Sequence, residues 1–412
     1  MDRWGICCFC DVLFKLKKVW ISPGKKMIVR ASQVENLSGK LFLGRETVNA
    51  LHVINGEHFS GAERVQDLLA MNLPDFGYAA SFATLKPGRF AECRQSLDSP
   101  LIHVPMKSRM DSSCSRRIAE LVRDGGIQLL HAHTPRSLMV AASAARIAKV
   151  PLIYHVHSPV GRDCGNWLKN RVNTWLESRW LKQCDHMICV SGSLKQYMVS
   201  LGHAESKLSV VRNGVAIVPS NEVTLPGEAW TMGTVALFRP RKGLEVLIQA
   251  LAILRERNCP VRLLAVGPFE TPAYQQEIES LVERLDVGSM IEWTGFEKDV
   301  NRRLRTMQVM VLPSLYGEGL PMVVLEAMAC GVPVVASRVE GIPEAIRDGI
   351  DGIVFEPGNS QELATSIQSM IGSPDAWHKM AVSARTRQRE SLSDVSMAQG
   401  VAAVYDQVIG CR

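Results

Sequence analysis

Residues 312–344 read LPSLYGEGLPMVVLEAMACGVPVVASRVEGIPE, and this stretch decides the fold that we expect for the chain. It follows an apolar strand at 309–312, runs through a glycine-rich loop at 317–319 and enters a helix at about Pro321. A helix that begins after such a loop directs its free N–H groups and the positive end of its dipole outward from its first turn. The pattern therefore predicts an α/β unit whose helix start can bind a phosphate.

Two glutamates stand at this helix start, Glu318 in the loop and Glu326 within the helix. Glu326 interrupts an otherwise apolar run, so it either faces a polar cavity or needs a partner, because an unpaired buried carboxylate is costly. The first interpretation, which we favour, makes both carboxylates acceptors for the hydroxyl groups of a nucleotide sugar. In the second, the helix dipole stabilises Glu318, and Glu326 pairs with a lysine or an arginine.

The composition indicates a globular protein of two domains. The chain has 412 residues, of which 46% are hydrophobic and 21% charged, and this length is enough for two domains with separate cores. No apolar run reaches the roughly 18 residues that cross a bilayer. The formal net charge of +6 arises within residues 1–45, and the balanced charge of the rest gives no indication of nucleic acid as a partner.

Residues 1–46 are expected to be a poorly structured basic extension. A short apolar patch comes first and lysines follow it, which is the reverse of a secretory signal. The alternative is a tether to the membrane surface. Cys189 and Cys330 lie in apolar stretches as core residues, and no disulfide framework is predicted. We therefore expect a cytoplasmic protein, with peripheral contact to the inner face of the membrane as the alternative.

Strands and helices alternate through the first half of the chain. The predicted strands are 49–54, 80–83, 127–131, 151–156 and 186–190, and the predicted helices are 62–73, 115–124 and 137–148. This alternation is typical of a parallel α/β sheet, whose functional loops follow the C-terminal ends of the strands. Two such ends carry four histidines, namely His131, His133, His155 and His157. No carboxylate or cysteine accompanies them in ligand register, so we interpret them as residues that shape a cleft and predict no metal site.

The second half repeats the alternation. The predicted strands are 233–238, 261–266 and 291–296, and the predicted helices are 244–257, two that begin at Gln361 and Ala376, and a last one at 395–409. A linker is predicted at 219–230, which contains two prolines and a glycine. A helix at 166–183 combines tryptophans with basic residues, and this pattern fits either a plain amphipathic helix or docking to an anionic membrane.

The opening stretch resembles the donor-site signature of the retaining glycosyltransferases of family 4. The matching residues are Pro313-Ser314, Glu318-Gly319-Leu320-Pro321, the run at 325–336 and Gly341-Ile342-Pro343-Glu344. The resemblance implies the GT-B fold, in which two Rossmann-like α/β domains with parallel sheets face each other across a donor-binding cleft. It implies an acceptor-side domain at 47–218, a nucleotide-sugar-binding domain at 219–394, and a helix at 395–412 that crosses back to the first domain.

The resemblance also implies which residues form the site. Glu326 is expected to bind the ribose, Glu318 the hydroxyl groups of the donor sugar, and His157 the sugar and the phosphate near the reacting centre. Lys242 is expected to meet the diphosphate, which makes His157, Glu318 and Lys242 the catalytic set. The donor-binding set is Gly61, Arg239, Lys242, Gly267, Glu318, Gly319, Leu320, Pro321, Met322 and Glu326.

One position departs from the family pattern. The family usually carries an arginine five residues before Lys242, where this chain has Leu237, and Arg239 is the nearest substitute. No Asp-x-Asp motif occurs in the chain, so neither a metal ion nor another cofactor is expected. Lys242, Arg239 and the helix start at 319–322 would neutralise the leaving diphosphate instead.

The predicted function is the transfer of a hexose from a nucleotide diphosphate sugar, with retention at the anomeric carbon, to a saccharide or lipid-linked acceptor. Such a reaction would serve the biosynthesis of a polysaccharide or glycoconjugate. The alternatives are a nucleotide-sugar epimerase or a phosphorylase of the same fold, and a non-catalytic nucleotide-sugar-binding protein. The sequence leaves the donor base, the donor sugar and the acceptor open.

Overall fold

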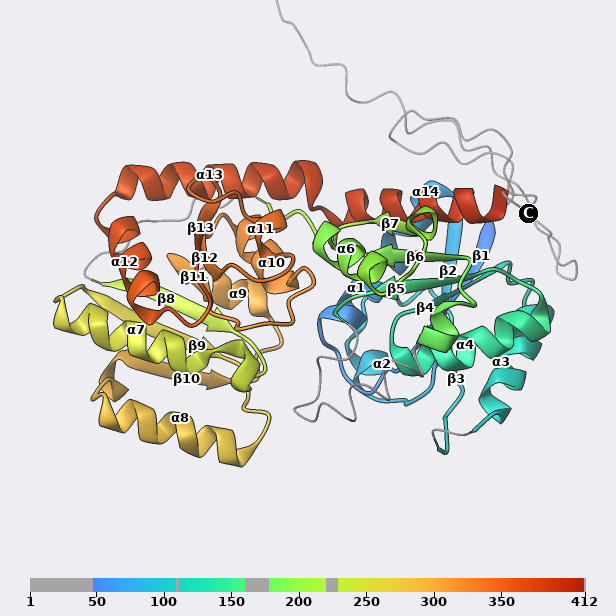
Figure 1. Ribbon diagram of the computed structural model, residues 1–412, viewed down its shortest axis with the longest axis horizontal. Coiled ribbons are helices and arrows are strands. Elements are labelled where there is room, and N and C mark those ends of the chain that lie inside the picture. The colour runs from blue at the N-terminus through green and yellow to red at the C-terminus, as the bar shows by residue number, and fades with distance from the viewer. Residues whose placement is uncertain (1–46, 109–110, 160–177, 220–228, 411–412) are drawn as a thin grey trace, which may run out of the picture. The chain divides into compact units, whose positions relative to one another are not determined.

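The computed structural model of the chain describes residues 47–108, 111–159, 178–219 and 229–410. The basic extension expected at 1–46 and most of the helix expected at 166–183 lie outside these residues, so both remain predictions. From Thr47 onward the chain forms one compact unit, which contains two parallel sheets (Figure 1).

The first sheet has seven strands in the order β3-β2-β1-β4-β5-β6-β7, and all neighbouring pairs are parallel. Its strands are β1 (Val48–Ile54), β2 (Tyr78–Thr84), β3 (Leu101–His103), β4 (Leu129–Ala132), β5 (Leu152–Val156), β6 (His186–Cys189) and β7 (Leu208–Val210). Every residue of β4, β5 and β6 is buried. Helices on both faces of a parallel sheet explain this burial.

The helices of this half are α1 (Gly61–Asn72), α2 (Arg89–Cys93), α3 (Ser113–Asp124), α4 (Pro135–Ala148) and α6 (Gly192–Ser200). Local capping fixes where two of them begin. Ser60 and Glu63 form a capping box before α1, with 2.5 Å between Ser60 Oγ and Glu63 Oε2. Thr134 accepts a hydrogen bond from the Ser137 N–H, and Pro135 suits the first helical position of α4. The predicted helices 62–73, 115–124 and 137–148 are confirmed to within two residues at each end.

The second sheet has six parallel strands in the order β10-β9-β8-β11-β12-β13. Its strands are β8 (Trp230–Val235), β9 (Val261–Val266), β10 (Ile291–Gly295), β11 (Val309–Leu312), β12 (Val334–Ser337) and β13 (Gly352–Phe355). Its helices are α7 (Leu244–Glu256), α8 (Pro272–Arg284), α9 (Val300–Leu304), α10 (Met322–Cys330), α11 (Ile342–Ala345), α12 (Ser360–Ile371) and α13 (Pro374–Ser391). Helices α7 and α12 pack against each other beside this sheet (Figure 1).

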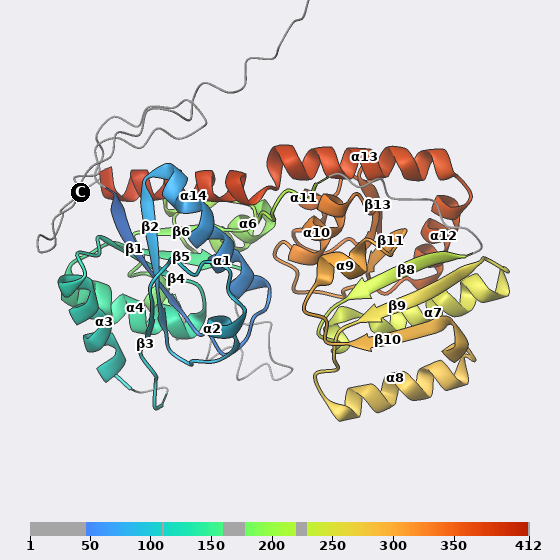
Figure 2. The same ribbon diagram turned by 180° about the vertical axis from the view of Figure 1, so that it is seen from behind.

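The last helix, α14 (Asp394–Gly410), packs against the first sheet rather than the second. It lies beside α1 (Figure 2). Asn72 Nδ2 donates a hydrogen bond to Asp394 (3.2 Å), and the Tyr78 hydroxyl donates one to Asp406 (2.8 Å). The fully buried Tyr405 of this helix completes the core beneath β1 and β4. The domain limits at 218 and 394 remain predictions.

Two parallel α/β sheets confirm the predicted fold class, but several local expectations were wrong or incomplete. Trp230, assigned to the linker, is the first residue of β8, because its ring packs against Trp377 with 5.7 Å between the ring centroids. Strand β3 was missed because it is short and partly exposed. Helix α8 was also missed, although Thr271 caps it by accepting a hydrogen bond from the Tyr274 N–H. In the part of the chain that the structure describes, no helix is long and apolar enough to cross a membrane.

We expect Trp377→Ala to lower the free energy of unfolding by about 3–5 kcal/mol, because it removes a large side chain from the core. Trp377 is 1% exposed, and its Nε1 donates a hydrogen bond to the Gln308 carbonyl oxygen (2.7 Å). Urea unfolding of the purified variant measures this loss. The neighbouring His378 is exposed, so His378→Ala should change the free energy by less than about 0.5 kcal/mol. Equal effects of the two substitutions would contradict the packing described here.

Candidate active site

The glycine-rich loop before α10 has a defined geometry. Gly317 adopts a φ of +82°, a conformation that side chains rarely tolerate, and Pro321 is the N-cap of α10. Glu340, in the loop after β12, accepts hydrogen bonds from the backbone N–H groups of Gly317 (3.0 Å) and Glu318 (3.1 Å). The shape of the loop is therefore fixed by a carboxylate that comes later in the chain.

Glu318 is buried and has its countercharge beside it. Its Oε1 accepts hydrogen bonds from Lys242 Nζ (2.5 Å) and Ser314 Oγ (2.6 Å), and Arg241 Nη1 lies 3.9 Å from the same oxygen. Lys242 and Arg241 belong to a 3₁₀ turn, Pro240–Lys242, directly before α7. Burial lowers the pKa of the Lys242 ammonium, while the adjacent Glu318 carboxylate opposes this shift. Two of the predicted catalytic residues are thus in direct contact.

Glu326 is 2% exposed and forms an ion pair with Arg64 of α1. This pairing is the second of the two interpretations that the sequence left open for Glu326. Apart from the ion pair, both carboxylate oxygens lack a hydrogen-bond partner among the described residues. An ionised carboxylate has about four acceptor sites, so Glu326 retains capacity to accept hydrogen bonds from a ligand.

Two close contacts bring loops of the first sheet to the start of α10. A Cβ atom on Gly319 would collide with the carbonyl oxygen of His157. A Cβ atom on Gly61 would lie 3.5 Å from Met322 Cγ. Gly61 and Gly319, two of the glycines predicted for the donor site, therefore lie where one half of the chain contacts the other. Larger residues at Gly319 would separate these segments.

His157 follows β5 and is half-buried beside this loop. Its Nε2 lies 3.3 Å from Nδ1 of His133, so its ring is held by a second histidine. Burial lowers the pKa of His157 to about 4. The imidazole is therefore neutral at pH 7, where it can donate or accept a hydrogen bond but supplies no positive charge.

Two further predicted residues, Arg239 and Gly267, make contacts with other residues. Arg239 pairs with Glu270, at 3.3 Å between Arg239 Nη1 and Glu270 Oε1. Gly267 follows β9 with a φ of +132°, and a Cβ atom there would collide with the Ala236 carbonyl oxygen. At the position of the family arginine, Leu237 is 43% exposed. The structure brings Arg241, rather than Arg239, to Glu318.

Three residues of the site were missed from the sequence. Arg241 stands next to Lys242, and that adjacency was a usable signal. Arg64 contacts Glu326 across a long separation in sequence, for which no local pattern exists. Glu344 was noted only as part of the motif, and its contacts depend on the packed fold.

Glu344 and Asn213 join the motif to the first sheet. The Glu344 carboxylate accepts hydrogen bonds from the backbone N–H groups of Gly192 and Ser193, both at 2.8 Å, at the start of α6. Free N–H groups and the helix dipole make this position favourable for a carboxylate. Asn213 Nδ2 donates a hydrogen bond to the Leu320 carbonyl oxygen (2.8 Å). Glu344 at the end of the motif is thus bound to the first half of the chain by charge-assisted hydrogen bonds, and Leu320 by a neutral one.

Two parallel α/β sheets that meet at a glycine-rich helix start define the class of GT-B proteins. The model of Glycosyltransferase Family 4 matches residues 59–217, and the model of Glycosyl transferases group 1 matches residues 220–387. The chain therefore belongs to the family 4 glycosyltransferases and has their GT-B fold, as the sequence motif indicated.

Individual relatives agree with this assignment. WcaL of Salmonella typhimurium, named for colanic acid biosynthesis, is 30% identical over 220 residues, which span 51% of this chain and about half (52%) of WcaL. The phosphatidyl-myo-inositol mannosyltransferase of Mycobacterium leprae is 26% identical over 309 residues, 73% of this chain and 76% of that protein. Anabaena HepE, solved in complex with UDP, superimposes with a TM-score of 0.76 at 22% identity and covers 87% of this chain and 100% of its own.

Glu344→Gln should lower the free energy of unfolding by roughly 1–2 kcal/mol, since it removes the charge from two hydrogen bonds at a helix start. Urea unfolding at pH 7 measures the change. Glu283 is exposed on α8, and Glu283→Gln provides a control that should stay within about 0.5 kcal/mol of the parent. If Glu344→Gln were as stable as this control, the hydrogen bonds of Glu344 to Gly192 and Ser193 would not contribute to the free energy of unfolding.

Proposed function

We propose that the chain transfers a hexose from a nucleotide diphosphate sugar to a saccharide or lipid-linked acceptor, with retention at the anomeric carbon. The observation that carries this proposal is the environment of Glu326, a buried carboxylate with unused acceptor capacity in the helix that follows the loop of the Lys242–Glu318 pair. The vicinal hydroxyl groups of a ribose are the donors that such a carboxylate accepts best. The other end of the donor would then reach Lys242 and Glu318.

The diphosphate would be neutralised by protein groups. Lys242 and Arg241 both lie near the single carboxylate of Glu318, so one positive charge is in excess there. When the donor enters, Lys242 would turn from Glu318 to the diphosphate, and Glu318 would accept hydrogen bonds from the sugar hydroxyls. The N–H groups at the start of α10 would add further donors. We propose no metal ion at the diphosphate, because the sequence has no Asp-x-Asp motif.

In the proposed reaction the acceptor hydroxyl attacks the anomeric carbon from the face that the diphosphate leaves. The bond between this carbon and the acceptor oxygen forms while the bond to the phosphate oxygen breaks. The hydroxyl proton passes to the departing diphosphate, through an oxocarbenium-like transition state. His157, which is neutral, would hold the sugar and the phosphate by hydrogen bonds.

The relatives support the substrate classes but leave them as proposals. HepE was also solved with UDP-glucose, which favours a UDP-hexose as the donor here. The names of WcaL and of the mannosyltransferase favour an acceptor in polysaccharide or lipid-linked saccharide assembly. A lipid-linked acceptor would require contact with the inner face of a membrane, which we keep as part of the proposal.

UDP and UDP-hexoses should raise the melting temperature of the purified chain without added metal, because a ligand that binds only the folded state stabilises it. At a concentration of 100 times Kd the gain is about 2.7 kcal/mol. Glu326→Gln should abolish most of this gain, whereas the exposed Glu279→Gln should keep it. No stabilisation by uridine, guanosine or adenosine nucleotides would contradict the proposed donor site.

Lys242→Ala should slow donor turnover by roughly 10²–10³-fold, the usual effect of removing a group that stabilises developing negative charge. Arg241→Ala should slow turnover more than Arg239→Ala, since Arg241 lies at Glu318 and Arg239 pairs with Glu270. Proton NMR of the product measures both the rate and the anomeric configuration. An inverted product would overturn retention, and conversion of the donor without acceptor would favour the epimerase.

A further inference from the structure

Five histidines form a buried cluster behind the candidate active site. His52 lies in β1, His131 in β4 and His155 in β5, while His133 and His157 follow the ends of their strands. The first four are between 0 and 2% exposed. The role proposed for His157 in donor binding does not explain why four further histidines are buried beside it.

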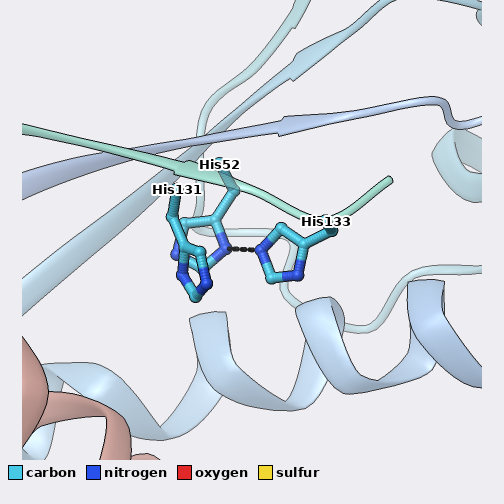
Figure 3. Close-up of side chains that lie close together, drawn as sticks. All are labelled: His52, His131 and His133. Atoms are coloured by element: carbon cyan, nitrogen blue, oxygen red, sulfur yellow. Dashed lines mark hydrogen bonds between the residues drawn. The ribbon is translucent and has the colours of Figure 1, made fainter. Parts of the chain in front are cut away.

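The sheet explains why these side chains meet. Strands β1 and β4 are parallel neighbours in which His52 is aligned with His131, and aligned residues of neighbouring strands point to the same face. His133 comes two residues after His131 and continues on that face. Figure 3 shows the three imidazoles facing one another, with the hydrogen bond between His52 and His133 drawn as a dashed line.

We propose that His52, His131 and His133 bind a divalent transition-metal ion, with zinc as the first candidate. One ring nitrogen from each lies within 4.8 Å of those of the other two. His52 Nδ1 and His133 Nε2 are 3.0 Å apart. Two ligands of one tetrahedral zinc, at Zn–N distances of about 2.0–2.1 Å, lie roughly 3.3 Å apart. A small rearrangement therefore converts the hydrogen-bonded pair into two metal ligands, with His131 as the third and water in the fourth position.

The remaining ring nitrogens have the partners that metal-binding histidines need. The Tyr405 hydroxyl lies 3.2 Å from His52 Nε2 and 2.7 Å from His131 Nδ1, and His133 Nδ1 lies 3.3 Å from His157 Nε2. Partners of this kind fix the tautomer and the orientation of a ligand ring. On metal binding, the proton shared by His52 and His133 would move to the outer nitrogen of its own ring, so each imidazole stays neutral.

Among the ring nitrogens of His52, His131 and His133, one is otherwise unexplained. His131 Nε2 is buried and has no hydrogen-bond partner among the described residues. Buried polar atoms normally have a partner, and each exception needs an explanation. A bond to a metal would satisfy this atom. The ion would then connect β1 and β4 and, through Tyr405, the helix α14, so its role would be structural.

The first test measures the zinc content of the purified full-length chain by mass spectrometry. The protein is stripped with a chelator, given one equivalent of zinc and separated from free ion. We expect one zinc per chain in the parent and none in His131→Gln. His186 is a buried strand histidine outside the cluster, bonded to Ser209 Oγ at 2.8 Å, so His186→Gln is the matched control and should retain the zinc. Full retention in His131→Gln, or no zinc in the parent, would overturn the proposal.

Two further measurements do not depend on whether a histidine variant folds. Tyr405→Phe keeps the packing and should weaken zinc affinity by about 10–100-fold, because it removes the partner of two ligand rings. X-ray absorption of the zinc-loaded parent should show a first shell of nitrogens at about 2.0 Å with imidazole scattering. A sulfur shell at about 2.3 Å would assign the ion to cysteine thiols and overturn the site.

A last comparison separates the proposed ligands from their neighbours. His133, His155 and His157 also offer ring nitrogens within 4.8 Å of one another. His52→Gln should remove the zinc, while His155→Gln should retain it. The opposite result would place the ion on the second group and overturn the set proposed here.

Discussion

The candidate site depends on the neutralisation of two buried carboxylates, one in the loop before α10 and one within that helix. Glu318 and Glu326 lie in an apolar core, where an unpaired charge would be strongly unfavourable. Lys242 supplies one countercharge from the loop after β8, and Arg64 supplies the other from α1. Both partners are far from α10 in sequence. The ion pairs therefore form only when each sheet has folded and α1 lies against the start of α10.

Such pairs suit a binding site better than they suit stability. A buried ion pair loses hydration and gives little net stabilisation, but removing one partner is severely unfavourable. In the proposed function, the donor substrate replaces the ion pairs that it disrupts. Its diphosphate oxygens can accept hydrogen bonds from Lys242, and its ribose hydroxyls can donate hydrogen bonds to Glu326. The charges of the site would then be compensated both without and with the bound donor. Such a site favours a ligand that carries an anionic group and hydroxyl groups together.

The sequence predicted what depends on local signals and missed what depends on the packed fold. Apolar runs with flanking glycines located β11 and the start of α10 to within a residue. In contrast, His52 lies inside an apolar strand, and its neighbour His131 is known only once β1 and β4 are adjacent in a fixed register. The partner of Glu326 was unpredictable for the same reason, because Arg64 reads as an ordinary surface residue of an amphipathic helix.

The departure at Leu237 shows how the fold can restore a charge that the motif lacks. Leu237 is 43% exposed, whereas Arg241, four residues later, donates a hydrogen bond to the Gly317 carbonyl oxygen (3.0 Å) and approaches Glu318. Arg241 and Lys242, both in the 3₁₀ turn Pro240–Lys242, approach the same oxygen of Glu318, at 3.9 and 2.5 Å. Arg241 Nε is buried without a hydrogen-bond partner among the described residues. The site therefore still has two cations for one carboxylate, and the second cation has a free donor for an anionic ligand.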